Sequence, residues 1–99
     1  MVEVLLNDED KKPDGTKIEA IGYEVPRSDQ FPEGVKYSFV YFHPDDDVNI
    51  LRYDNAHEHA GSKHHKHVRG ETHPVDYEGS VEQQYEKFLN EVEEIYEHE

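Results

Sequence analysis

Residues 35–42 (VKYSFVYF) form the most apolar and aromatic run in the chain. Aromatic and β-branched side chains favour extended backbone, so this run predicts a central strand. Loop-type sequence lies on both sides of it: residues 26–34 (PRSDQFPEG) contain two prolines and a glycine, and residues 43–47 (HPDDD) turn the chain. Residues 48–53 (VNILRY) then return as the hairpin partner of this strand.

The chain before this hairpin predicts further strands. Residues 1–6 alternate weakly and predict a short strand or a frayed end, and the polar run at 7–16 (NDEDKKPDGT) is typical of a turn. Residues 17–25 predict another strand, in which the apolar alternation changes phase at Ile21, beside Gly22. A phase change of this kind beside a glycine predicts a β-bulge.

The end of the chain predicts one long helix, at about residues 80–97. Ser80 and Gln83 have the spacing of a capping box, and the residues after them follow the 3.6-residue period of an amphipathic helix. The apolar positions of this period are Val81, Tyr85, Phe88, Leu89, Val92, Ile95 and Tyr96. Glutamates occupy the outer face, which we therefore expect to be solvated.

These elements predict one α+β domain, residues 1–99. A small antiparallel sheet of about four to five strands, within residues 1–76, packs against the long C-terminal amphipathic helix. The last strand of the sheet is expected at residues 67–69. A chain of 99 residues buries one modest core at most.

The chain is strongly acidic, with 24 acidic against 10 basic residues and a formal net charge of −14. Such a surface repels nucleic acid over most of its area. Two explanations stay open: a halophilic protein in a salt-rich cytoplasm, where ions screen the charge, or an ordinary acidic protein. The seven lysines are more than we expect of an extreme halophile.

Composition excludes several classes of site. The chain has no cysteine, which excludes disulfides, Cys-containing zinc sites and thiol nucleophiles. A membrane span needs about 18 consecutive apolar residues, and the chain has no such run. It also has no basic segment followed by an apolar one at its start, so we expect no signal peptide. The expected location is the cytoplasm.

A histidine-rich stretch at residues 52–73 holds six of the eight histidines: His57, His59, His64, His65, His67 and His73. Positions 57 and 59 are two residues apart, as are positions 65 and 67. In extended backbone each pair projects from one face of the strand, and His64 points the other way. Imidazole has an unperturbed pKa of about 6.5, so it transfers protons near neutrality, and it binds transition metals. We expect the chemistry of the protein to lie in this stretch.

Three segments carry a resemblance to a known family: FPEGVKYSFVYF at 31–42, RYDNAHEHAG at 52–61 and HHKHV at 64–68. Together with the amphipathic terminal helix they resemble the TumE-type toxin family of bacterial and archaeal toxin–antitoxin pairs. The most specific part is RYDN at 52–55 followed by HHKH at 64–67. The resemblance implies a toxin encoded beside an antitoxin, often a DNA-binding protein, and an action on RNA.

The motif contains the groups that RNA cleavage needs: a base for the 2′-hydroxyl proton, an acid for the leaving oxygen and a cation over the phosphate. We predict that His65 and His67 share the acid and base roles. Arg52 is expected to hold the phosphate, and Asp54 to orient one imidazole. Three more basic residues are expected to form a strip that accepts the RNA backbone: Lys63, Lys66 and Arg69.

The same residues support other interpretations. A divalent transition metal can bind a ligand set drawn from His57, His59, His65 and His67, although their spacing matches none of the usual zinc motifs. The stretch can also be a solvated loop in which Arg52 and Asp54 form a plain ion pair, which contributes little stability. A further alternative is a non-catalytic interaction module, whose partner covers the exposed sheet or the helix.

Overall fold

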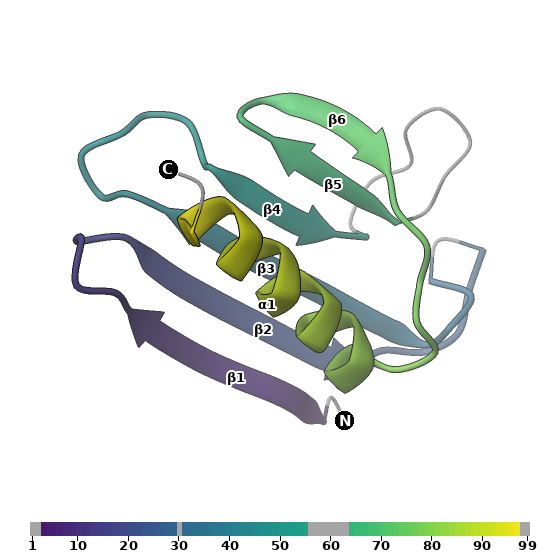
Figure 1. Ribbon diagram of the computed structural model, residues 1–99. Helices are drawn as coiled ribbons and strands as arrows, with labels where there is room; N and C mark the ends of the chain where they lie inside the picture. The colour runs from purple at the N-terminus through teal and green to yellow at the C-terminus, as the bar shows by residue number, and fades with distance from the viewer. Residues whose placement is uncertain (1–2, 30, 56–63, 98–99) are drawn as a thin grey trace.

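Six antiparallel strands and one helix form the described part of the chain, residues 3–29, 31–55 and 64–97 of a computed structural model (Figure 1). The elements are β1 Val4–Lys11, β2 Lys17–Glu24, β3 Val35–Phe42, β4 Leu51–Asp54, β5 His65–Val68, β6 Glu71–Pro74 and α1 Val81–Glu97. The strands pair in chain order, from β1 at one edge to β6 at the other. The α+β class is confirmed. The predicted four to five strands are wrong, because the sheet has six.

The additional strand is β6, which is polar and exposed along its whole length. It follows β5 through a turn at Arg69 and Gly70, whose φ angles of 49° and 90° are the two positive values that a type I′ hairpin turn requires. Because no residue of β6 is buried, no apolar alternation marks it in the sequence. The strand predicted at 67–69 lies instead at His65–Val68, and Arg69 belongs to the turn.

Strand β1 continues through much of the polar run that predicted a turn. Residues 7–11 pair with residues 17–21 of β2, and their side chains are exposed, as polar side chains on an edge strand can be. The turn is confined to the segment around Gly15, which has a φ angle of 92°. There Asp14 Oδ1 accepts bonds from the backbone N–H and the hydroxyl of Thr16, at 3.0 and 2.6 Å. These bonds lower the pKa of Asp14.

The expected bulge in β2 is absent. Its alternation continues through Gly22, which faces the helix, while Ile21 is exposed. A Cβ atom at Gly22 would lie 2.6 Å from Val81 Cγ1, so only glycine allows α1 to begin this close to the sheet. The register irregularity lies opposite, in β1, between Val4 and Leu6.

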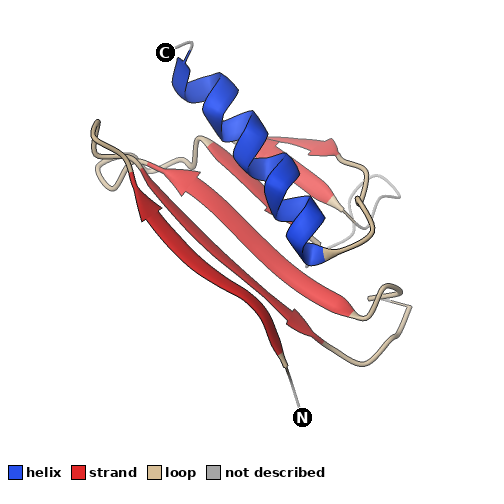
Figure 2. Cartoon of the chain, turned by 60° about the horizontal axis from the view of Figure 1, so that its bottom comes forward, coloured by secondary structure: helices blue, strands red, loops and turns tan. Residues whose placement is uncertain are grey.

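Helix α1 lies across one face of the sheet (Figure 2). It packs on the aromatic side chains of that face. The Phe88 ring centroid is 5.6 Å from that of Phe39 and 5.3 Å from that of Tyr53. Burying a phenylalanine completely stabilises the fold by about 1.5–3 kcal/mol. The N-cap bond of the predicted capping box is present, because Gln83 N donates to Ser80 Oγ at 3.1 Å, and the Ser80 hydroxyl in turn donates to Gln83 Oε1 at 3.1 Å.

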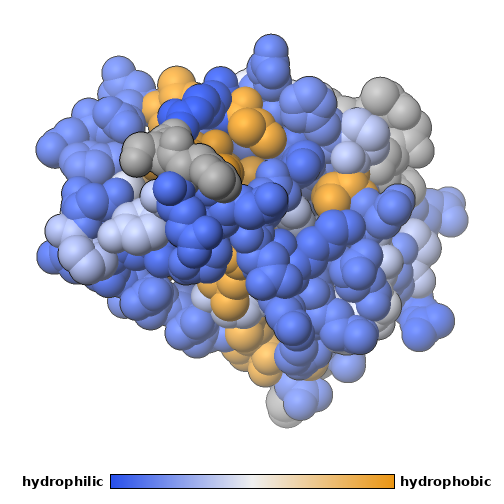
Figure 3. Space-filling view, viewed as in Figure 1, coloured by the Kyte–Doolittle hydropathy of each residue, from blue (hydrophilic) through white to orange (hydrophobic). Residues whose placement is uncertain are grey.

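The outer surface on the helix side is mostly hydrophilic, with small apolar areas (Figure 3). No described element lies on the opposite face of the sheet (Figure 2). Within the described ranges, no helix has the length and hydropathy that a membrane span needs.

Candidate functional site

The pairing of β4 with β5 places four motif side chains on one face of the sheet. Asp54 is directly opposite His65, and Arg52 is directly opposite His67. Directly opposed residues share a face, and so do residues two apart on one strand. We call these four residues the Asp54 cluster. It lies on the face away from α1, because the intervening residue of β4, Tyr53, contacts the helix.

The Asp54 carboxylate is the centre of the cluster. Its Oδ1 is 3.2 Å from His65 Nδ1, and its Oδ2 is 2.8 Å from Arg52 Nε and 3.6 Å from His67 Nε2. The other ring nitrogen of His67, Nδ1, is 3.1 Å from Thr72 Oγ1. A buried carboxylate is costly without compensating charge or donors, and Arg52 supplies a positive charge next to it.

Burial divides the cluster into an inner and an outer half. The side chains of His65 and Asp54 are only 1% and 7% exposed. Those of His67 and Arg52 are 27% and 41% exposed. A ligand therefore meets His67 and Arg52 first.

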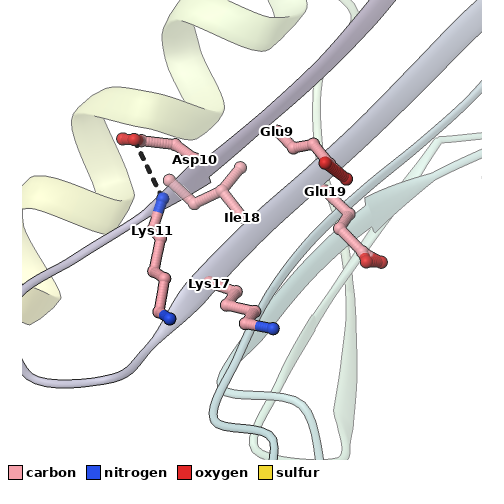
Figure 4. Close-up of a pocket in the computed structure, with 6 residues that line it drawn as sticks. All are labelled: Glu9, Asp10, Lys11, Lys17, Ile18 and Glu19. Carbon is pink, nitrogen blue, oxygen red and sulfur yellow. Dashed lines mark hydrogen bonds between the residues drawn. The ribbon is translucent and has the colours of Figure 1, made fainter.

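The outer half opens into a depression of about 240 Å³. Its lining consists of Asp47, Val48, Asn49, Arg52, His67 and Gly70. A larger depression of about 370 Å³ lies elsewhere, between β1 and β2 (Figure 4). Its described lining contains lysines, acidic residues and Ile18 but no histidine, so its larger volume is no evidence for a catalytic site.

His64 belongs to a different environment from its neighbour in the motif. Its Nδ1 is 3.0 Å from the Tyr37 hydroxyl, and its Nε2 is 3.2 Å from Glu33 Oε1. Its ring stacks on Tyr77, with centroids 4.6 Å apart. Tyr37 also accepts a bond from Gln84 of α1, so His64 faces the helix side. This is the direction opposite to His65 and His67 that the alternation of side chains predicts. Burial raises the pKa of Tyr37.

The two described residues of the predicted RNA-binding strip, Lys66 and Arg69, lie in different environments. Lys66 is on the helix side, where its Nζ is 3.1 and 3.3 Å from the two carboxylate oxygens of Glu91. Arg69 lines a depression next to residues 46–50, which shares Asp47, Val48 and Asn49 with the depression beside His67. Lys63 lies outside the described residues.

The predicted metal ligands are partly brought together. His65 and His67 are neighbours, with ring centroids 6.2 Å apart. His57 and His59 lie outside the described residues. The structure adds Asp54 to the donor set: one ligand atom from each of Asp54, His65 and His67 lies within 4.8 Å of the others. No sequence pattern indicates Thr72 as a partner of His67, because this contact depends on the β5–β6 turn.

The comparison with protein families matches residues 8–96 to the family described as Toxin TumE. The chain belongs to this family. The match extends from β1 to the last turn of α1, which confirms the resemblance that the RYDN and HHKH segments indicate. Membership indicates a toxin-like role and implies an antitoxin partner. The comparisons with curated proteins and with solved structures gave no match.

Proposed function

We propose that this chain is the toxin of a toxin–antitoxin pair and that it cleaves RNA by histidine acid–base chemistry at the Asp54 cluster. One observation carries the proposal: two imidazoles and a guanidinium surround one buried carboxylate on a face that α1 leaves uncovered. Family membership supports the toxin role. An RNA target places the reaction in the cytoplasm.

The reaction that fits these groups uses the 2′-hydroxyl of RNA as the nucleophile. A base takes the hydroxyl proton as the 2′ oxygen attacks phosphorus, and the bond from phosphorus to the 5′ oxygen breaks as an acid protonates that oxygen. The products are a 2′,3′-cyclic phosphate and a 5′-hydroxyl end. A cation next to the phosphate stabilises the charge that develops on it.

Arg52 is the group suited to the phosphate. Its ion pair with Asp54 is made through Nε, and a guanidinium also has terminal N–H donors in a planar fork that matches phosphate oxygens. Its side chain is 41% exposed, so it can reach a bound ligand without a change of fold.

The two imidazoles are placed unequally for proton transfer. His67 lines the depression, so its ring is the one that a substrate reaches directly. His65 lies 3.2 Å from Asp54 Oδ1, in the arrangement by which a carboxylate orients an imidazole. Because His65 is almost completely buried, its contact with RNA requires that the groups over it move on binding. We therefore assign His67 the first contact with substrate and His65 the second proton-transfer role.

The proposal is tested by expression in cells that lack the antitoxin, with growth and RNA integrity as readouts. His67→Ala and His65→Ala should each lower activity by about 10²- to 10⁴-fold, and Arg52→Ala should also be severe. His73→Ala is the matched control, because His73 is an exposed histidine of β6 outside the cluster. Circular dichroism checks that each variant folds. Full toxicity in both His65→Ala and His67→Ala would contradict the proposal and favour a non-catalytic interaction module.

The partner follows from the same proposal. A toxin of this type is controlled by an antitoxin encoded beside it, so the neighbouring reading frame should encode a small DNA-binding protein. Co-expression of that protein should restore growth. If it does not bind the chain, the toxin–antitoxin assignment fails.

A further inference from the structure

We propose that Asp54, His65 and His67 form a site for one divalent transition metal ion of the zinc or nickel type, and that the bound ion blocks the acid–base chemistry. The inhibitory part rests on the proposed function, whereas metal binding can be measured without any RNA. The site differs from a set of four histidines, because a carboxylate supplies one of its donors.

The distances between the donors are close to those of a metal site. A tetrahedral ion with ligands at about 2.1 Å holds its donor atoms about 3.4 Å apart. Asp54 Oδ1 is 3.2 Å from His65 Nδ1, and Asp54 Oδ2 is 3.6 Å from His67 Nε2. These two distances involve different oxygens of Asp54, and one donor atom of each residue lies within 4.8 Å of the others, so an ion must draw the three donors together by side-chain rotation.

The donor chemistry also fits. Two neutral imidazoles and one carboxylate are a common ligand set for zinc and for other divalent transition metals. A histidine that binds metal usually has its second nitrogen held by another group, and His67 Nδ1 lies 3.1 Å from Thr72 Oγ1. This contact leaves Nε2 directed at the carboxylate. The depression of about 240 Å³ beside His67 has room for water as a further ligand.

Arg52 opposes the metal. Its Nε is 2.8 Å from Asp54 Oδ2, so the guanidinium forms an ion pair with the carboxylate that the metal ion needs. An entering cation must displace this guanidinium and is repelled by it. Removal of Arg52 should therefore strengthen metal binding, although the same change should abolish RNA cleavage. If Arg52 only supported the fold, its removal would not have opposite effects on metal binding and on RNA cleavage.

Metal binding and proton transfer exclude each other at His67. Its Nδ1 is held by Thr72, so both processes use the lone pair on Nε2, and a coordinated ring can neither take nor give a proton there. At His65 the ion takes Nδ1 and removes the contact by which Asp54 orients the ring. Zinc or nickel should thus inhibit RNA cleavage, and a chelator should restore it. Inhibition should follow the same affinity as direct binding.

The test is titration calorimetry of the full, untagged chain with zinc and nickel at pH 7.5. Wild type should bind one ion. His67→Ala and Asp54→Asn should weaken binding by about 10²-fold, within the range expected for loss of a ligand or of its support. Arg52→Ala should tighten it by about 10-fold, and His73→Ala should leave it unchanged. Because His67→Ala and Asp54→Asn change different ligands, the site can still be tested if one of the two variants does not fold.

Two results would overturn the site. The first is binding that is unchanged in both His67→Ala and Asp54→Asn. The second is loss of binding in the double variant His57→Ala, His59→Ala with full binding in His67→Ala, which would move the site to that segment. Saturable binding that depends on His67 supports the site even in a protein that cleaves no RNA, so this inference and the proposed function fail separately.

Discussion

Asp54 lies directly opposite His65 in the ladder of β4 and β5, and its Oδ1 is 3.2 Å from His65 Nδ1. This relationship depends on the register of the two strands. A slip by one residue would put Lys66 or His64 opposite Asp54 and turn the histidine pair toward the helix. The register therefore decides whether the motif residues form a site at all.

Asp54→Asn should lower both stability and activity. The amide keeps the shape of the side chain but removes the negative charge between Arg52 and the imidazoles. We expect a loss of about 1–3 kcal/mol in the free energy of unfolding and at least about 10² in activity. Urea denaturation measures the first. Glu86→Gln, on the exposed face of α1, should change stability by less than about 0.5 kcal/mol. Equal stability of the two variants would contradict this account of the cluster.

Gly22→Ala should destabilise the protein by about 1–3 kcal/mol, because its Cβ would lie 2.6 Å from Val81 Cγ1. Val81→Ala alone also costs stability through a cavity. In the double variant the new methyl group enters the space that Val81 leaves, so the combined loss should be smaller than the sum of the two single losses. Thermal or urea unfolding of the three variants gives this difference. Additive losses would show that the two residues are not in contact.

Much of the fold could be predicted from the sequence because its core side chains follow the periods of their elements. The run at 35–42 and the helix after Ser80 have apolar residues that are indeed buried against each other. Strand β6 and the second half of β1 could not be predicted in this way, because edge strands with exposed side chains have no apolar period. The bulge predicted beside Gly22 is wrong. The glycine is needed there because Val81, which is distant in the sequence, packs closely against it.

The candidate site could be predicted only in part. The spacing of His65 and His67 predicts one shared face, and the structure places both beside Asp54. The unequal burial of the two histidines depends on the tertiary structure and has no sequence signal. The position of Lys66 also has no sequence signal. Its neighbours in the sequence suggest a basic strip, but in the structure it pairs with Glu91 of α1.

Stability should fall at alkaline pH. Burial raises the pKa of Tyr37 and of Tyr53 above the ordinary value of 10.0. The folded state thus keeps both phenols protonated, while the unfolded state releases these protons above about pH 10. Their contribution is complete below pH 10 and is lost as pH rises, at up to about 1.4 kcal/mol per pH unit for each group.

Urea unfolding at pH 8, 9.5 and 11 measures this dependence. In Tyr53→Phe the free energy of unfolding should fall less steeply above pH 10. The difference should be up to about 1.4 kcal/mol per pH unit, the contribution of one phenol. A free energy of unfolding that stays constant or rises up to pH 11 would show that these phenols are not protected in the folded state.

Salt should stabilise the protein. With a formal net charge of −14, the folded chain repels itself, and Glu9 lies directly opposite Glu19 in the ladder of β1 and β2. We expect the midpoint of thermal unfolding to rise by several degrees between low and molar potassium chloride, where charges are screened within about 3 Å. Glu9→Gln should reduce this rise. A midpoint that does not move with salt would rule out self-repulsion as a significant cost.

Cleavage of a short RNA by the purified chain tests the central claim most directly. One substrate is all RNA, and its partner carries 2′-deoxy nucleotides throughout; metal is removed with a chelator before the assay. The account predicts that wild type cuts only the RNA substrate and leaves 2′,3′-cyclic phosphate ends, and that His67→Ala slows the reaction by about 10²-fold or more while His73→Ala does not. Cleavage of the deoxy substrate, undiminished cleavage by His67→Ala, or no cleavage by wild type would contradict histidine acid–base catalysis at the Asp54 cluster.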